Sequence, residues 1–196
     1  RLALGVFTTS CCAICIVGSL GLRPGKFLLL PNVIDTGRFV PGQKLHDPDE
    51  FVMLGVGSLG PAKRFDRFLS IAVSLRARLR RQVRAIIAGD GSLRNQIEGL
   101  AEQARQHGVR AELMGRVVDT LKLYQSANVL LMTSDWEGTP NVIMEAMACG
   151  LPVVATNVGG FGDLVKHVET GFLLAPDYSD GAVDALYRLV PYSEWA

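Results

Sequence analysis

The chain has 196 residues, of which 48% are hydrophobic and 20% are charged, so it can bury a sizeable core. Lys and Arg number 20 and Asp and Glu number 19, and the resulting net charge of +1 gives no overall attraction to nucleic acid or to an anionic membrane. We therefore expect one domain, or one domain with part of another, and no nucleic acid among its partners.

The N-terminal stretch Leu2–Leu22 carries no charge and is long enough to cross a bilayer. Polar residues at 8–10 interrupt it, and residues 2–9 also fit a buried strand followed by a short helix capped by Ser10. We prefer the buried strand, with a membrane span as the alternative. A second apolar run at residues 26–30 predicts another strand.

Cys12 and Cys15 have the C-x-x-C spacing, but no second cysteine pair or histidine cluster lies near them in the sequence. A zinc site would therefore lack ligands. Together with Cys11 and Cys149, they fit small buried side chains in a reducing compartment. The sequence shows no other spacing typical of metal ligands, so we expect no metal site.

A polar segment at residues 35–50, with two prolines and two glycines, predicts a linker. After it, six apolar runs alternate with helical patterns. Because these runs are continuously apolar, both faces of the sheet must be covered, as in an α/β doubly wound parallel sheet of the Rossmann-like type. The expected strands are 51–56, 83–88, 111–114, 128–133, 152–156 and 171–174, and the expected helices are 63–81, 92–107, 118–126, 140–149, 160–167 and 180–189.

If these strands take the common order 3-2-1-4-5-6, the strand order reverses between the first and the fourth strand. This position is the switch point of the sheet. Ligands of such sheets bind beyond the carboxyl ends of the strands at that point. The loops there are residues 57–63, which read GSLGPAK, and residues 134–140, which read SDWEGTP. We expect the two loops to face each other.

The first loop has the chemistry of a phosphate site. Gly57 and Gly60 let the backbone approach a ligand closely, and Lys63 adds a cation suited to phosphate. The helix predicted after the second loop adds free backbone N–H groups that attract an anion. Its first residues are Gly138, Pro140, Asn141 and Val142.

Glu137 and Glu145 stand eight positions apart beside this phosphate site, although a carboxylate repels phosphate. Carboxylates bind vicinal hydroxyls well, because each oxygen accepts one O–H. One would hold a ribose diol and the other a sugar, so the pattern predicts a nucleotide diphosphate sugar as ligand. Taken singly, Glu137 also fits a surface loop, Glu145 an ordinary helix position and Lys63 a solvated side chain.

The block EGTPNVIMEAMACGLPVVAT at residues 137–156 resembles the E-x7-E signature of the retaining GT-B-fold glycosyltransferases known as glycosyl transferases group 1. Residues 157–160 (NVGG) resemble a family loop near the donor, and residues 31–35 (PNVID) resemble the interdomain hinge. The strand and loop at 128–134 also fit the family pattern. The resemblance extends from about residue 8 to residue 176.

The resemblance implies roles for single residues. Glu145 would bind the ribose diol, and Glu137 would contact the donor sugar and is the candidate catalytic residue. Lys63 and the backbone from Thr139 to Val142 would hold the diphosphate, and the base would pack near Gly115 and Arg116. These enzymes generally need no metal for donor binding, so no cofactor is expected beside the nucleotide-sugar co-substrate.

Ser58 departs from the family pattern, which commonly has an arginine at this position. The exchange removes a second cation from the expected diphosphate site, where Ser58 remains a candidate contact. The resemblance also implies a domain division. Residues 1–34 would be the tail end of an N-terminal acceptor domain, residues 35–50 the interdomain linker and residues 51–190 the donor-binding domain.

We therefore expect the donor-binding half of a hexosyltransferase that uses a UDP- or GDP-sugar in surface polysaccharide or glycoconjugate synthesis. Its partner would be the N-terminal acceptor domain of a longer parent enzyme, and the 196 residues alone would be inactive. The location would be cytoplasmic, with peripheral association of the parent at the inner membrane face left open. An NDP-sugar epimerase of the same fold and a non-catalytic nucleotide-sugar-binding module are the alternatives.

Overall fold

The structure, a computed structural model, describes residues 6–8, 27–29, 32–42, 47, 49–138, 140–175 and 179–190. Strands β1 (Val6–Thr8) and β2 (Phe27–Leu29) pair in parallel, and they lie within the two apolar runs near the N-terminus. The helix expected between them, with Cys11, Cys12 and Cys15, lies outside the described residues. Within the described ranges, no helix combines the length and the apolar character that crossing a bilayer requires.

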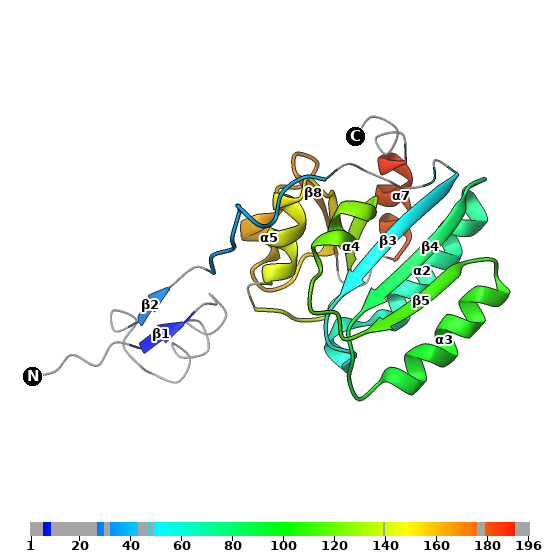
Figure 1. Cartoon of the computed structure of the whole chain (residues 1–196), viewed down its shortest axis with the longest axis horizontal. Coiled ribbons are helices and arrows are strands. Elements are labelled where there is room, and N and C mark those ends of the chain that lie inside the picture. Colours follow the sequence, from blue (N-terminus) through cyan, green and yellow to red (C-terminus); the bar gives the residue numbers. More distant parts are fainter. Residues whose placement is uncertain are drawn as a thin grey trace, which may run out of the picture.

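The main sheet has the strand order β5-β4-β3-β6-β7-β8, with all neighbouring strands parallel (Figure 1). This is the predicted 3-2-1-4-5-6 order, and the doubly wound fold is confirmed. The switch point therefore lies between β3 and β6. The strands are β3 (Glu50–Val56), β4 (Gln82–Ala88), β5 (Arg110–Gly115), β6 (Val129–Met132), β7 (Val153–Thr156) and β8 (Gly171–Leu174).

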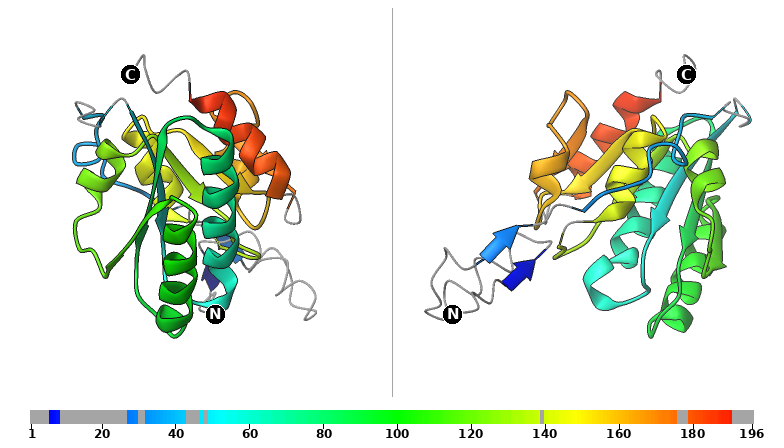
Figure 2. Two further views of the ribbon diagram at one scale, coloured as in Figure 1. Left: turned by 90° about the vertical axis from the view of Figure 1, so that its right-hand side faces the viewer. Right: turned by 60° about the vertical axis from the view of Figure 1, so that its left-hand side comes forward.

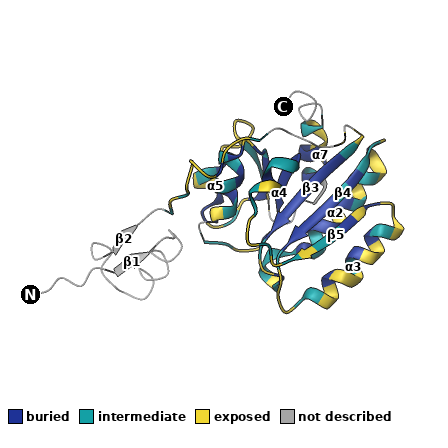
Figure 3. Cartoon of the chain, in the orientation of Figure 1, coloured by how far each residue is buried: buried dark blue, intermediate teal, exposed yellow. Residues whose placement is uncertain are grey.

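Helices cover both faces of this sheet (Figure 2). Helices α2 (Phe65–Arg78), α3 (Arg94–Gln106) and α7 (Ser179–Leu189) pack on one face. Helices α4 (Leu121–Ser126), α5 (Asn141–Ala148) and α6 (Phe161–Leu164) pack on the other. The strands between the two layers are largely buried, whereas the outer side of α3 is exposed (Figure 3).

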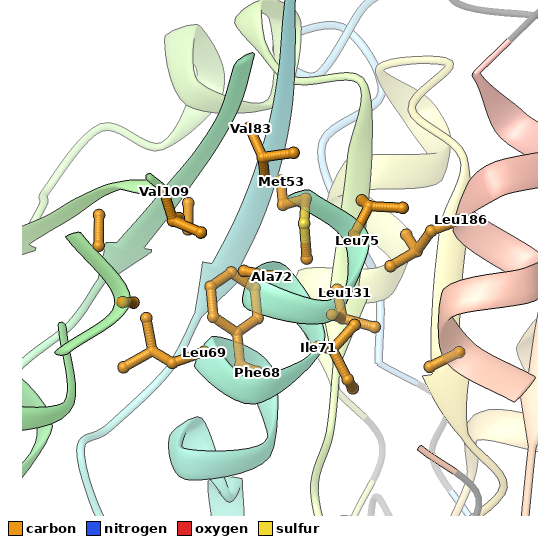
Figure 4. Close-up of a cluster of buried hydrophobic side chains, with 14 of the residues drawn as sticks. Met53, Phe68, Leu69, Ile71, Ala72, Leu75, Val83, Val109, Leu131 and Leu186 are labelled. Carbon is orange, nitrogen blue, oxygen red and sulfur yellow. The ribbon is translucent and has the colours of Figure 1, made fainter. Parts of the chain in front are cut away.

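Each face of the sheet has its own core, because side chains alternate between the faces along a strand. Met53 points to the α2 side, where it joins Phe68 and Leu75 (Figure 4). Its neighbours Val52 and Leu54 belong to the second cluster, on the α4 and α5 side. All of these side chains are at most 2% exposed, which explains why the strands are continuously apolar in the sequence.

The helix after β3 begins at Phe65, two residues later than predicted. Lys63 instead ends a short 3-10 turn, Pro61–Lys63, and Arg64 has a left-handed backbone with φ 50° and ψ 47°. A left-handed residue cannot continue a right-handed helix, so the chain changes direction there. Other boundaries shift as well: α2 ends at Arg78 instead of 81, α3 begins at Arg94 instead of 92, α4 begins at Leu121 instead of 118, and α6 ends at Leu164 instead of 167.

Residues 35–42, the first half of the predicted linker, pack against the sheet domain. Phe39 is 8% exposed and meets the ring of Tyr124 edge-on, with 6.1 Å between the ring centroids. Arg38 lies over the Phe39 ring, and its Nη2 is 3.0 Å from Asp119 Oδ1. This half of the segment therefore contributes to the core beside α4.

Candidate functional site

The loops after β3 and β6 are joined by hydrogen bonds at the carboxyl edge of the sheet. The Asp135 N–H donates to Ala62 O at 2.8 Å. The buried Thr133 hydroxyl lies 3.1 Å from Lys63 O and 2.9 Å from Arg64 O. The structure thus brings together the two loops that the sequence placed at the switch point.

Lys63 and Glu137 form an ion pair between these loops, through Nζ and Oε1. Their side chains are 17% and 13% exposed, so water screens the pair weakly. Ser134, which is fully buried, donates its Oγ–H to the same Glu137 oxygen at 2.8 Å. The lysine cation and the glutamate carboxylate are therefore held in a defined position.

Asp135 connects the same two loops through a second set of charges. Its Oδ2 is 2.9 Å from Arg64 Nη1, and its Oδ1 is 2.5 Å from Arg67 Nη1. Arg64 also contacts Asp66, with Nη2 and Oδ2 2.9 Å apart. Hydrogen bonds from Arg64 hold the pKa values of Asp135 and Asp66 below their usual range. These contacts fix the side chain of the left-handed residue that follows Lys63.

Glu145 lies on α5 and accepts a hydrogen bond at Oε2 from the Tyr124 hydroxyl, 2.7 Å away. Burial and then the Glu145 carboxylate raise the pKa of Tyr124, so the phenol remains a donor. Cys149, one helical turn further on, is free and buried, as the sequence predicted. Burial, with a smaller contribution from Glu145, also raises the pKa of this thiol.

Two glycines bring the loops at this edge into backbone contact. Gly159 has φ +55°, and a Cβ added there would lie 2.0 Å from Glu137 O. A Cβ added at Gly89 would lie 1.8 Å from Gly57 O. Neither position has room for a side chain, so the loops after β4 and β7 press against the loops after β3 and β6.

A pocket of about 540 Å³ opens beside these loops, near the carboxyl ends of β3, β4 and β5. This volume lies within the range of small-molecule sites. Three predicted site residues, Gly57, Ser58 and Arg116, line it. Its other lining residues are Val56, Ala88, Gly89, Asp90, Gly91, Val117 and Thr120.

The predicted site residues thus form two groups that meet at Gly57. One group lines the pocket, and Gly115, with φ +68°, directly precedes its member Arg116. The second group holds the Lys63 pair, and a Cβ at Gly57 would lie only 2.9 Å from Lys63 Cε. These contacts place the lysine beside the pocket.

The start of α5 completes the second group. Pro140 is the N-cap and cannot cap the helix with its side chain, and Asn141 and Val142 are the first helical residues. Asn141 is exposed, and its Oδ1 accepts a hydrogen bond from Asn32 Nδ2 at 2.7 Å. Gly138 is half-buried next to the ion pair, and Thr139 lies outside the described residues.

Sequence reasoning missed Tyr124 and Ser134, which contact the two glutamates directly. Tyr124 resembles any apolar core residue of a short helix, and no sequence signal identifies the partner of its hydroxyl. Asp90 was not among the predicted site residues, yet it lines the pocket together with Gly89 and Gly91. Across the described residues, His, Cys, Asp and Glu side chains form no group of three or more that could hold a metal ion.

The family model for glycosyl transferases group 1 matches residues 38–191. The chain is 31% identical over 186 residues to an Escherichia coli UDP-Gal:alpha-D-GlcNAc-diphosphoundecaprenol alpha-1,3-galactosyltransferase, covering 90% of this chain and 48% of that protein. It is 32% identical over 165 residues to a Mycobacterium tuberculosis GDP-mannose-dependent alpha-mannosyltransferase, covering 80% and 41%. The chain spans about half the length of the curated relatives it matches.

Solved structures share the fold. HepE from Anabaena, in complex with UDP-glucose, matches with a TM-score of 0.81 and 25% identity, over 99% of this chain and 56% of that one. TarM from S. aureus, in a complex that includes UDP, gives 0.83 and 20%, over 95% and 37%. The C-terminal domain of the Francisella tularensis group 1 family protein LpcC gives 0.69 and 21%, over 83% and 90%.

Proposed function

Because the chain belongs to the glycosyl transferases group 1 family, we propose that it binds the nucleotide-sugar donor of a retaining glycosyltransferase. The names of two relatives specify UDP-galactose and GDP-mannose as donors, and HepE was crystallised with UDP-glucose. These names support a UDP- or GDP-sugar as the ligand of this chain. We propose surface polysaccharide or glycoconjugate synthesis as the setting of the longer enzyme.

The observation that carries the proposal is the contact between the pocket and the ion pair. Gly57 lines the pocket and lies against Lys63, which pairs with Glu137. A nucleotide diphosphate sugar needs a cavity for its base, cations or N–H groups for its phosphates and carboxylates for its hydroxyls. The pocket near Arg116 would hold the base, and Lys63 with the start of α5 would hold the phosphates. The two glutamates would accept the hydroxyls.

Each glutamate has a separate task in this arrangement. Glu145 would accept the ribose hydroxyls, since the Tyr124 hydroxyl donates to one of its two carboxylate oxygens and leaves acceptor capacity for a ligand. Glu137 would accept hydroxyls of the donor sugar. Its negative charge would also stabilise the positive charge that develops on the sugar as the bond to phosphate breaks. Lys63 would then share its charge between Glu137 and the departing diphosphate.

We also propose the domain division that the family pattern implies, with residues 51–190 as the donor-binding unit and residues 35–50 as the connection to the acceptor domain. The packing of Phe39 against Tyr124 supports this division, with the start of the connection on the donor side. The acceptor groups would come from the remaining part of the parent enzyme. The 196-residue chain would accordingly bind donor without transferring sugar, which an assay with a labelled donor and added acceptors measures.

Calorimetric titration with UDP, GDP, ADP and the free nucleosides tests the proposal. A saturable site for UDP or GDP is expected, and Glu145→Ala should weaken it by about 1.5–3 kcal/mol, the scale of a hydrogen bond to a charged group. Glu169→Ala, an exposed position after α6, is the matched control and should bind as the wild type does. Absence of binding by every nucleoside diphosphate would contradict the proposal.

One observation favours a second candidate, a nucleotide-sugar-binding module without transfer activity. Ser58 is exposed at the pocket and supplies no cation where the family pattern has arginine. The parent enzyme distinguishes the two candidates. Donor binding without turnover in the full-length protein would favour the module, and turnover would favour the transferase.

A further inference from the structure

Tyr124 is among the largest fully buried side chains of the described residues, with 1% of its surface exposed. A buried phenol needs a partner for its hydroxyl, because an unpaired polar group in a core is costly. The partner is Glu145 Oε2, at 2.7 Å. This buried phenol is therefore joined to a carboxylate of the candidate site.

We propose that Tyr124 is a positioning residue of the donor site, whose hydroxyl fixes the Glu145 carboxylate in the orientation that receives the ribose diol. The proposal rests on the proposed function, since it assigns the ribose to Glu145. Tyr124 itself does not touch the donor. Its effect on binding passes through the geometry of Glu145.

A glutamate side chain has three rotatable bonds, and a half-buried one on a helix surface can sample several rotamers. A hydrogen bond from a rigid, buried donor selects one of them before any ligand binds. The entropy cost of ordering the Glu145 side chain then belongs to folding, so it does not reduce the free energy of ligand binding. Because Oε2 accepts one hydrogen bond from the Tyr124 hydroxyl, Oε1 and the remaining lone pair of Oε2 are available to two hydroxyls.

The Tyr124 ring is itself held in place from the linker side. Phe39 meets it edge-on at 6.1 Å, and Arg38, paired with Asp119, lies over Phe39. Such an aromatic pair adds stability and geometric definition beyond the area it buries. The segment that leads into the domain thus supports the ring whose hydroxyl orients Glu145.

The direction of the hydrogen bond agrees with this role. Burial raises the pKa of Tyr124, and the hydrogen bond to Glu145 and the charge of that carboxylate raise it further. The phenol therefore stays protonated and donates to the carboxylate. Thr120, whose carbonyl accepts the Tyr124 backbone N–H at 3.1 Å, lines the pocket, so the helical turn that carries the tyrosine adjoins the pocket wall.

The test compares UDP with 2′,3′-dideoxy-UDP, which lacks the diol, on the 196-residue chain. Tyr124→Phe keeps the ring and removes the hydroxyl. It should weaken UDP binding about tenfold and leave the dideoxy ligand within about twofold, so the preference of the protein for the diol falls. Tyr187→Phe, which removes the hydroxyl of an exposed tyrosine on α7, is the control and should change neither affinity.

A double-mutant cycle with Glu145→Gln adds a second readout. If the hydroxyl acts through the carboxylate, Tyr124→Phe should cost little once Glu145 is changed. Phe39→Leu keeps the hydroxyl but removes the edge contact, and a smaller loss confined to UDP is expected. This variant also tests the proposal if Tyr124→Phe does not fold.

Equal losses for UDP and the dideoxy ligand, or no loss at all in Tyr124→Phe and Phe39→Leu, would overturn the inference. So would additive effects of the Tyr124 and Glu145 changes. A wild-type chain that binds no nucleoside diphosphate would instead overturn the proposed function. A wild type that binds both ligands equally would remove only the assignment of ribose to Glu145 and the inference built on it.

Discussion

Lys63 and Glu137 are 74 positions apart in the sequence, yet their side chains form an ion pair that is at most 17% exposed at either partner. The pair joins the loops after β3 and β6 at the switch point of the sheet. Each charge depends on the other, because a mostly buried ion that loses its partner keeps its desolvation cost.

Lys63→Met should therefore lower the free energy of unfolding by about 1–3 kcal/mol, since Glu137 would lose its cation and keep only Ser134. UDP affinity should fall as well. Lys122→Met, at an exposed position on α4, should stay within about 0.5 kcal/mol of the wild type. Urea denaturation measures both variants, and identical curves for them would show that the pair contributes nothing.

Ser58→Arg should tighten UDP or GDP by about 0.5–1.5 kcal/mol, because arginine can bind phosphate oxygens bidentately and serine cannot. The affinity for uridine should not increase, because uridine has no phosphate. Ser70→Arg adds the same charge on the exposed side of α2 and serves as the control. Equal increases in affinity for UDP and uridine, measured by calorimetry, would show that this loop does not contact the phosphates.

Gly159→Ala should destabilise the domain by at least about 2 kcal/mol, because φ +55° disfavours alanine and the new Cβ would lie 2.0 Å from Glu137 O. Nucleotide affinity should fall with it, since Glu137 would have to move. Gly99→Ala is the matched control: it lies in α3 with open space around it and should stabilise by about 0.5–1 kcal/mol. Equal stabilities of the two variants in thermal denaturation would contradict the close contact between Gly159 and Glu137 O.

Acid should remove one specific contribution to stability. Hydrogen bonds from Arg84, at 3.0 and 2.9 Å, hold the pKa of Glu112 below its usual 4.5. A carboxylate whose folded pKa is depressed stabilises the protein above the unfolded pKa, and this stabilisation is lost as the pH falls through the folded value. Glu112→Gln should therefore be less stable than the wild type near neutral pH and similar to it in strong acid.

The check is denaturation of wild type and Glu112→Gln at about pH 7 and about pH 3, on either side of the unfolded pKa. Glu169→Gln, an exposed position, provides the comparison and should follow the wild type at both values. A constant difference between wild type and Glu112→Gln across this range would show that the Arg84 contact does not depend on the Glu112 charge.

The sheet could be predicted because burial on both faces is recorded in the sequence as uninterrupted apolar runs. Strand β6 (Val129–Met132) consists of four buried apolar residues, and it pairs with β3 and β7 as the predicted strand order requires. The two switch-point loops followed from that order. The sequence therefore predicts that their glycines, Lys63 and Glu137 lie at the same edge of the sheet.

The contacts around the glutamates could not be predicted, because they depend on how separate elements pack. Tyr124 meets Glu145 through the packing of α4 on α5, and a hydroxyl gives no sequence signal of its partner. Ser134 could equally have faced solvent. The helix start after β3 was placed too early because nothing in the sequence marks Arg64 as left-handed, a conformation that usually belongs to glycine.

The left-handed backbone of Arg64 has a consequence for how this turn can change in evolution. Glycine would adopt φ 50° without the penalty of about 1–2 kcal/mol that an ordinary residue bears there. Glycine, however, has no guanidinium to span Asp66 and Asp135. Exchanging Arg64 for glycine would therefore remove the backbone strain and, with it, the ion pair to the loop after β6. The rigidity of this turn can thus change in evolution while Lys63 and Glu137 stay the same.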